Sequence, residues 1–144
     1  MTLPESAPAR ITLYWSAIWR GAVTTATFAV PLALLQKWLV EGDRISGGDA
    51  INLLLYVAIM FCGAAGGFGA AKLSPTSRLQ NGAAAAALAA LAIQIAGAVR
   101  HVIISEPVSS PISWIFLALL LSTFGMFGAW IDQKSRPSTS GDPR

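Results

Sequence analysis

The sequence is poor in the residues from which catalytic and metal sites are usually built. Its 144 residues include one cysteine and one histidine, and charged residues make up 12%. The single Cys62 excludes an intramolecular disulfide, and the paired-cysteine spacings of zinc sites are absent. We therefore expect no metal, no cofactor and no redox chemistry.

Acidic residues are also missing from the middle of the apolar stretches. The seven are Glu5, Glu41, Asp43, Asp49, Glu106, Asp132 and Asp142. Proton-coupled transport through a buried carboxylate therefore has no carrier residue. No nucleophile, base and orienting group form a recognisable set, and His101 has no partner evident from the sequence. We expect that the protein is not an enzyme.

Apolar residues, in contrast, are abundant. They make up 54% of the chain, the mean hydropathy is +0.59, and four segments approach the roughly 20 residues that a hydrocarbon core requires. We predict an all-α integral membrane four-helix bundle in residues 10–132, between a disordered N-terminus (1–9) and a disordered cytoplasmic tail (133–144). The predicted spans are residues 21–40, 50–71, 82–104 and 111–131.

Local patterns refine the predicted helix ends. Thr12, Ser16, Arg20 and Thr24 recur every four residues, so the first helix is expected to begin near Arg10 and to carry them on one stripe. Asp49 is expected to cap the second helix. A serine followed by a proline at residues 110–111 predicts the start of the fourth helix.

The basic residues indicate the orientation of the chain in the membrane. The net charge of +3 is spread over the ends of the apolar segments and forms no dense run, so we expect no nucleic acid partner. With the N-terminus in the cytoplasm, seven basic residues lie inside and three outside. The inner ones are Arg10, Arg20, Lys72, Arg78, Lys134, Arg136 and Arg144, and the outer ones are Lys37, Arg44 and Arg100. This excess predicts that both termini lie in the cytoplasm, and we expect the bacterial inner membrane as the location.

Small residues cluster at the ends of the second and fourth spans. GGFGA at residues 66–70 matches GMFGA at residues 125–129, a spacing of 59 residues, and the first and third spans both begin with Gly-Ala. These matches indicate two parallel-repeated helical hairpins, with chance similarity in a Gly- and Ala-rich sequence as the alternative. Small residues allow helices to approach closely in lipid. The predicted helix-packing residues are Gly63, Gly66, Gly67, Gly69, Gly125 and Gly128.

Four polar residues are candidates for a functional role: Arg20, Thr24, Gln94 and Asp132. Arg20 lies either at the headgroup level, in contact with lipid phosphate, or at an inner gate, where Asp132 is the nearest counter-ion and Asn81 a neutral option. Gln94 is the only strongly polar side chain near the middle of a span. It either bonds a neighbouring helix or lines a polar pathway.

The two GGFGA-like motifs, the basic loop after the first and the Gly-Ala start of the third span together carry a family resemblance. Over most of residues 21–131 the chain resembles the small four-span bacterial membrane proteins of unknown function, whose second span ends in a GGF-x-x-G-like motif. Small multidrug exporters are similar in size but use a glutamate in the first span, which this chain lacks. Fluoride channels share FCG at residues 61–63 but not the rest of their signature.

These observations leave two functional hypotheses. The first is a noncatalytic accessory or assembly subunit that packs through small-residue helix faces. The alternative is a small oligomeric transporter or channel with a polar pathway near Arg20 and Gln94. In either case we expect the lipid bilayer as the surroundings, and another membrane protein or a second copy of the chain as the partner.

Overall fold

The computed structural model describes residues 12–103 and 110–136, and this part of the chain forms four α-helices. They are α1 (Trp15–Glu41), α2 (Ala50–Leu73), α3 (Arg78–Ile103) and α4 (Pro111–Ser135). Each is long and apolar enough to cross a membrane. The predicted all-α four-helix fold is confirmed, and the chain is a multi-pass membrane protein.

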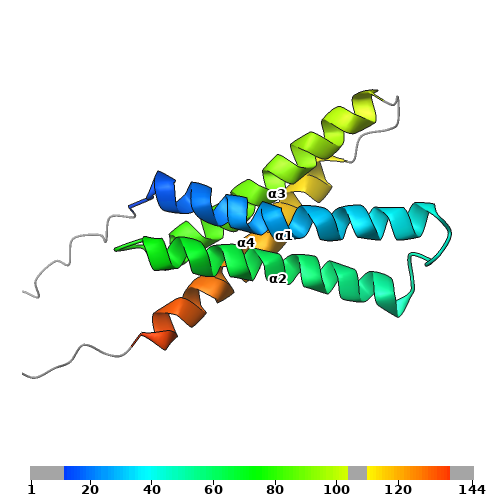
Figure 1. Cartoon of the computed structure of the whole chain (residues 1–144). Coiled ribbons are helices and arrows are strands. Elements are labelled where there is room, and N and C mark those ends of the chain that lie inside the picture. Colours follow the sequence, from blue (N-terminus) through cyan, green and yellow to red (C-terminus); the bar gives the residue numbers. More distant parts are fainter. Residues whose placement is uncertain (1–11, 104–109, 137–144) are drawn as a thin grey trace, which may run out of the picture.

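Two antiparallel hairpins build the bundle. Figure 1 shows the α1–α2 hairpin crossing the α3–α4 hairpin, with the start of α1, the α2–α3 loop and the end of α4 on one side. We call this side the terminal end, and the opposite side, which carries the α1–α2 loop, the hairpin end. Helix α2 packs against the other three helices, as its small-residue sequence predicts, and so does α3. In the described part of the chain α1 and α4 do not pack against each other.

In the interior of the bundle small side chains are buried and large ones face outward, the opposite of the arrangement in a soluble protein. Its buried apolar side chains are mostly alanines, whereas large side chains such as Phe28, Leu54, Phe116 and Leu119 are exposed. Lipid tails are as apolar as these side chains, so burying them against another helix gains little. Small residues let helix backbones come close enough for dense van der Waals contact, which explains the alanine-rich interior.

The first hairpin closes around Gly21. A methyl group added to Gly21 would lie 2.6 Å from the carbonyl oxygen of Gly66 and 2.7 Å from the Cβ of Ala70. One turn later, Thr25 is fully buried against Gly66 and donates from its hydroxyl to the Gly21 carbonyl over 3.1 Å. Only glycine at residues 21 and 66 permits this separation of α1 and α2.

The second hairpin repeats these contacts. A methyl group added to Gly82 would lie 2.9 Å from the carbonyl oxygen of Gly125 and 2.7 Å from the Cβ of Ala129. Ala86 takes the place of Thr25, 2.6 Å from a methyl group added to Gly125. The glycine and alanine contacted in each hairpin are the first and last residues of the repeated motif. The equivalent contacts support a duplicated hairpin.

The two hairpins meet where α2 crosses α4. A methyl group on Gly67 would overlap the backbone of Gly125, and one on Gly128 would overlap the Ala64 carbonyl. At this crossing the two backbones touch directly. A two-fold axis relating the hairpins would exchange α1 with α3 and α2 with α4. The contact between α2 and α3 would then require an equal contact between α4 and α1, which is absent within the described residues. The hairpins are therefore alike inside but packed asymmetrically.

Two predicted helix ends differ from the structure. Residues 12–14 are not helical, so the predicted start near Arg10 is wrong, and Thr12 is not part of the helical stripe. Helix α4 continues to Ser135, where we predicted a tail from residue 133. The predicted disordered residues 1–9, and the tail beyond residue 136, lie outside the described residues.

Of the two helix caps predicted from the sequence, the one at α4 forms and the one at α2 does not. Asp49 forms no side-chain cap on α2; its carboxylate accepts from the Ser46 amide over 2.6 Å, which closes the α1–α2 loop instead. At α4 the prediction is confirmed, because Ser110 accepts from the Ser113 amide and Pro111 occupies the first helical turn.

We expect Gly67→Ala to destabilise the fold by about 1–3 kcal/mol, because its Cβ meets backbone rather than a side chain that can move. Thermal unfolding in detergent, followed by circular dichroism, measures the effect. Gly69→Ala is the matched control, since a Cβ at Gly69 meets nothing within 4 Å and alanine favours the helix by about 1 kcal/mol. Equal stability of the two variants would contradict the backbone contact at the crossing.

Candidate functional site

The terminal end of the bundle holds the best-connected buried polar residue, Asn81. Its side chain is fully buried, and its Oδ1 accepts from the Tyr14 amide over 2.9 Å. Its Nδ2 lies 3.2 Å from the carbonyl oxygen of Thr12, 3.3 Å from that of Thr76 and 3.0 Å from that of Ser77. One amide thus joins the segment before α1 to the α2–α3 loop and to the first turn of α3.

Two further bonds hold the same segment, residues 12–14, which we call the N-terminal strap. The Thr12 amide donates to the Ser77 hydroxyl over 3.2 Å, and the Tyr14 and Thr76 hydroxyls lie 3.3 Å apart. Side chains of the α2–α3 loop and of the first turn of α3 therefore bind backbone groups that a helix would otherwise use. This competition explains why α1 begins at Trp15 rather than near residue 10.

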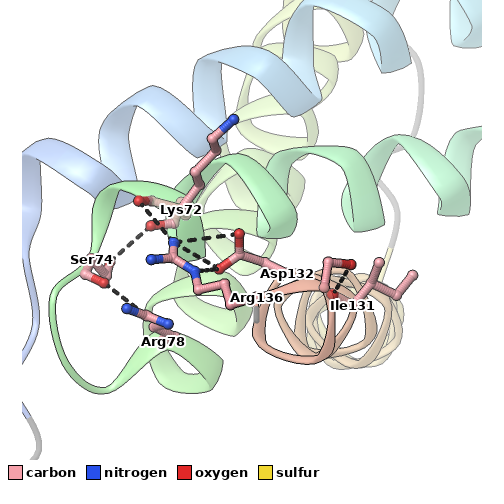
Figure 2. Close-up of polar contacts among 8 residues, drawn as sticks. Lys72, Ser74, Arg78, Ile131, Asp132 and Arg136 are labelled. Carbon is pink, nitrogen blue, oxygen red and sulfur yellow. Dashed lines mark hydrogen bonds and ion pairs between the residues drawn. The ribbon is translucent and has the colours of Figure 1, made fainter. Parts of the chain in front are cut away.

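Asp132 and Arg136 form the second polar contact of the terminal end. Asp132 is buried, and both of its carboxylate oxygens accept from the Arg136 guanidinium, with the shortest distance 3.1 Å. Arg136 also donates to the Lys72 carbonyl over 3.4 Å. Figure 2 shows the guanidinium between Asp132 and the last turn of α2. Arg136, the residue directly after α4, and not Arg20, is the counter-ion of Asp132.

Arginines also satisfy the carbonyl groups at the end of α2. Arg78 donates from Nε to the Ser74 carbonyl over 3.1 Å, and Arg136 reaches the Lys72 carbonyl. The last carbonyls of a helix have no partner within the helix and carry its negative dipole end, so cations are favoured there. Figure 2 shows both guanidinium groups beside this turn. Their first role is to cap α2.

Arg20 and Thr24 do not face the bundle. The Arg20 side chain is exposed, and Thr24 is half-buried and donates from its hydroxyl to the Arg20 carbonyl over 2.9 Å. Ser16, one turn before Arg20, is exposed as well. Arg20 therefore lies on the outer surface of α1, and its contact with lipid headgroups stays a prediction.

Gln94 connects α3 to α4. Its Nε2 donates to the Trp114 carbonyl over 3.1 Å, near the start of α4. The half-buried side chain thus bonds between helices, as the simpler of its two interpretations predicts. Gln94 lies between α3 and α4, and Arg20 lies outside α1, so the structure does not bring these two residues together.

Five of the six predicted packing glycines lie at helix interfaces. Gly66 faces α1, Gly67 and Gly128 lie at the crossing of α2 and α4, and Gly125 contacts both α2 and α3. At Gly63 an added methyl group would lie 2.9 Å from the Leu121 side chain. Gly69 is the exception, because a side chain there would enter open space on the surface of α2.

The hairpin end has its own buried amide, Asn52. Its Oδ1 accepts from Gln36 over 2.7 Å, and its Nδ2 donates to the Gly47 carbonyl over 2.7 Å. In the sequence Asn52 and Tyr56 lie four residues apart in the second span, where either hydrogen bonding between helices or a polar pathway is expected. The structure shows the first for Asn52, which joins α1, the α1–α2 loop and α2.

Shallow apolar grooves run along the surface between helices. One of about 560 Å³ separates α1 from α2 and is lined by Thr27, Phe28, Pro31, Leu32, Ala58 and Ala65, among others. Another of about 360 Å³ separates α1 from α3 and includes Lys37 and His101. The side chains named here come from the outer faces of the helices and open toward the surrounding lipid.

No protein family, characterised protein or solved structure matches this chain. The resemblance to small four-span bacterial membrane proteins therefore stays a prediction. The candidate site consists of a buried amide and a buried ion pair at the terminal end, and of apolar grooves on the surface.

Asn81→Ala should release the N-terminal strap, because it removes the acceptor of the Tyr14 amide and the donor to the Thr12 carbonyl. We expect at least tenfold faster hydrogen exchange at the Tyr14 amide and a stability loss of about 1–3 kcal/mol. Mass spectrometry of exchanged peptides measures the first effect. Gln80→Ala, at an exposed neighbouring position, is the control and should exchange as the wild type does. Unchanged protection in Asn81→Ala would rule out the strap contact.

The Asp132–Arg136 pair predicts two unequal substitutions. Arg136→Gln leaves a buried carboxylate unpaired, whereas Asp132→Asn leaves an arginine that is 41% exposed and can reach water or headgroups. We therefore expect a loss of about 2–3 kcal/mol for the first variant and about 1 kcal/mol for the second. The free energies of unfolding of the two single variants and of the double variant give the interaction energy between Asp132 and Arg136. Equal losses for the two single variants would contradict the burial of Asp132.

Proposed function

We propose that this membrane protein is a noncatalytic accessory or assembly subunit of the bacterial inner membrane. The observation that carries the proposal is that these polar side chains are bonded within the fold. Asn81 and Asp132 at the terminal end, and Gln94 between α3 and α4, each hold helices or loops together. Such residues support a fixed scaffold better than a reaction centre or a continuous pathway.

The packing of the interior supports the same proposal. The α2–α4 crossing places backbone against backbone at Gly67 and Gly125, which leaves no room for a solute between these helices. The two grooves beside α1 lie on the outside of the bundle, and the pocket between α2, α3 and α4, which Gln94 lines, holds only about 100 Å³. A protein with this construction offers surfaces to lipid or to another membrane protein rather than an interior to a substrate.

The distribution of cations supports an orientation with both termini in the cytoplasm. Basic residues gather at the terminal end: Arg20, Lys72, Arg78, Lys134 and Arg136. At the hairpin end, Lys37 pairs with Glu41 over 3.1 Å, and Arg44 stacks on Trp38, 3.8 Å from the ring centre. Because the cytoplasmic side carries the excess of Lys and Arg, we assign the terminal end to the cytoplasm.

The proposal predicts a partner present at a fixed ratio. The full chain carrying an affinity tag, extracted from its own membrane in two mild detergents, is expected to retain the same membrane protein in the same molar ratio in both. Cross-linking in intact membranes before extraction should give one discrete adduct. Recovery of the chain alone in both detergents, with no adduct, would contradict an assembly role.

A flux assay separates this function from transport. The purified chain in liposomes is expected to move neither ions nor small solutes above the rate of empty vesicles. If flux is observed and both Arg20→Leu and Gln94→Leu abolish it, a pathway through these residues replaces the subunit proposal. Lys134→Leu is the control, because Lys134 lies over the Trp130 ring on the outside of α4.

A further inference from the structure

The groove between α1 and α2 has an unusual floor. Large side chains, Phe28 on α1 and Phe61 on α2, stand on its two sides, but on α2 it ends toward the terminal end at the small Ala65. One turn beyond Ala65 toward the terminal end lies Gly69, where an added Cβ would meet nothing within 4 Å. The depression in α2 therefore continues past the lined groove toward the headgroup region.

Cations stand on both sides of this end of the groove. Arg20 lies seven residues before Thr27 on α1, and Lys72 lies seven residues after Ala65 on α2. Seven residues are within about 20° of two full turns, so each cation is on the groove face of its own helix, about 10 Å beyond the groove. Both side chains are exposed.

The two cations are also level with each other. The helices are antiparallel, and a methyl group on Gly21 would lie 2.7 Å from the Cβ of Ala70. Arg20 is one residue, and Lys72 two residues, closer to the terminal end than this contact. At 1.5 Å per residue their Cα positions differ by only about 1.5 Å along the bundle. They form the two sides of a single cationic entrance.

Neither cation has another partner among the described residues. The carboxylate of Asp132 is occupied by Arg136, and Glu41 by Lys37 at the opposite end. Figure 2 shows the Lys72 side chain extending away from Asp132 and Arg136; Arg136 bonds only the Lys72 backbone carbonyl. In the part of the chain that the structure describes, Arg20 and Lys72 form no ion pair, so both charges are available to an anion.

We propose that this entrance and groove bind one anionic glycerophospholipid from the leaflet at the terminal end. The phosphate lies between Arg20 and Lys72, and an acyl chain follows Gly69 and Ala65 into the groove between the helices. The dimensions agree, because the distance of about 10 Å from the cations to the groove falls within one leaflet, half of a core about 30 Å thick. Two basic side chains between helices at one leaflet have the chemistry of a lipid headgroup site.

The charge part of the proposal is tested by lipid titration of the purified full chain in detergent, with bound lipids counted by native mass spectrometry. The wild type should bind the first phosphatidylglycerol at least tenfold more tightly than phosphatidylcholine. Arg20→Gln and Lys72→Gln should each weaken it about fivefold, and the double variant about 25-fold. Lys134→Gln, which removes a cation away from the groove, should leave the affinity unchanged.

The groove part is tested by filling the depression at Gly69, between the two cations and the groove. Gly69→Leu keeps every charge and enters open space, so the fold should persist, as circular dichroism will verify, while phosphatidylglycerol binds at least tenfold more weakly. Gly97→Leu is the matched control, since Gly97 is an equally open glycine in the α1–α3 groove, and it should bind as the wild type does.

Four outcomes would overturn the proposal. The first is equal affinity for the two lipids, and the second is a loss of phosphatidylglycerol affinity in Lys134→Gln equal to that in Arg20→Gln or Lys72→Gln. The third is unchanged affinity in a folded Gly69→Leu variant. The fourth is displacement of the lipid by millimolar inorganic phosphate. The last result would mean that the two cations bind a free anion and that the groove contributes nothing.

Discussion

The bundle depends on direct contact between helix backbones at glycine. Within lipid, helices gain little from burying large apolar side chains against each other, so attraction comes from dense contact at short range. The crossing of α2 and α4 at Gly67 and Gly125, and the pairing of α1 with α2 at Gly21 and Gly66, supply that contact. A single methyl group at any of these four positions would separate the helices it lies between. Alanines fill the remaining interior, and the large side chains face outward.

Contacts of this kind hold helices together but fix their ends poorly, and buried polar groups complete the fold there. Asn81 fixes the strap and the α2–α3 loop at the terminal end, Asn52 fixes the α1–α2 loop at the hairpin end, and Asp132 with Arg136 fixes the end of α4 to the end of α2. A buried polar group left without a partner is costly in any apolar medium. Each of these residues therefore also favours one alignment of its helices over the neighbouring ones.

Sequence patterns predict most of the fold and only part of this polar set. Hydropathy locates the four helices, and the Ser-Pro pair locates the start of α4, because both signals are local. The strap was not predictable, since the contact of Tyr14 with Asn81 joins residues far apart in the chain. The same holds for Gly69: it belongs to the same motif as Gly67, but the crossing direction of α2 and α4, which no local pattern encodes, places only Gly67 in the interface.

The asymmetric packing of two similar hairpins determines which surfaces stay open. Within each hairpin the repeated motif makes the same contacts, so the structure that repeats is a single hairpin. Between hairpins, α2 and α3 meet in the middle, whereas α1 and α4 stay apart in the described structure. Two small residues of α2 remain at the surface of the α1–α2 pair: Ala65, which lines the groove beside α1, and Gly69, where an added Cβ would meet nothing within 4 Å. Small residues in a membrane helix thus have two different effects here: beside a helix they bring backbones together, and beside lipid they leave a depression.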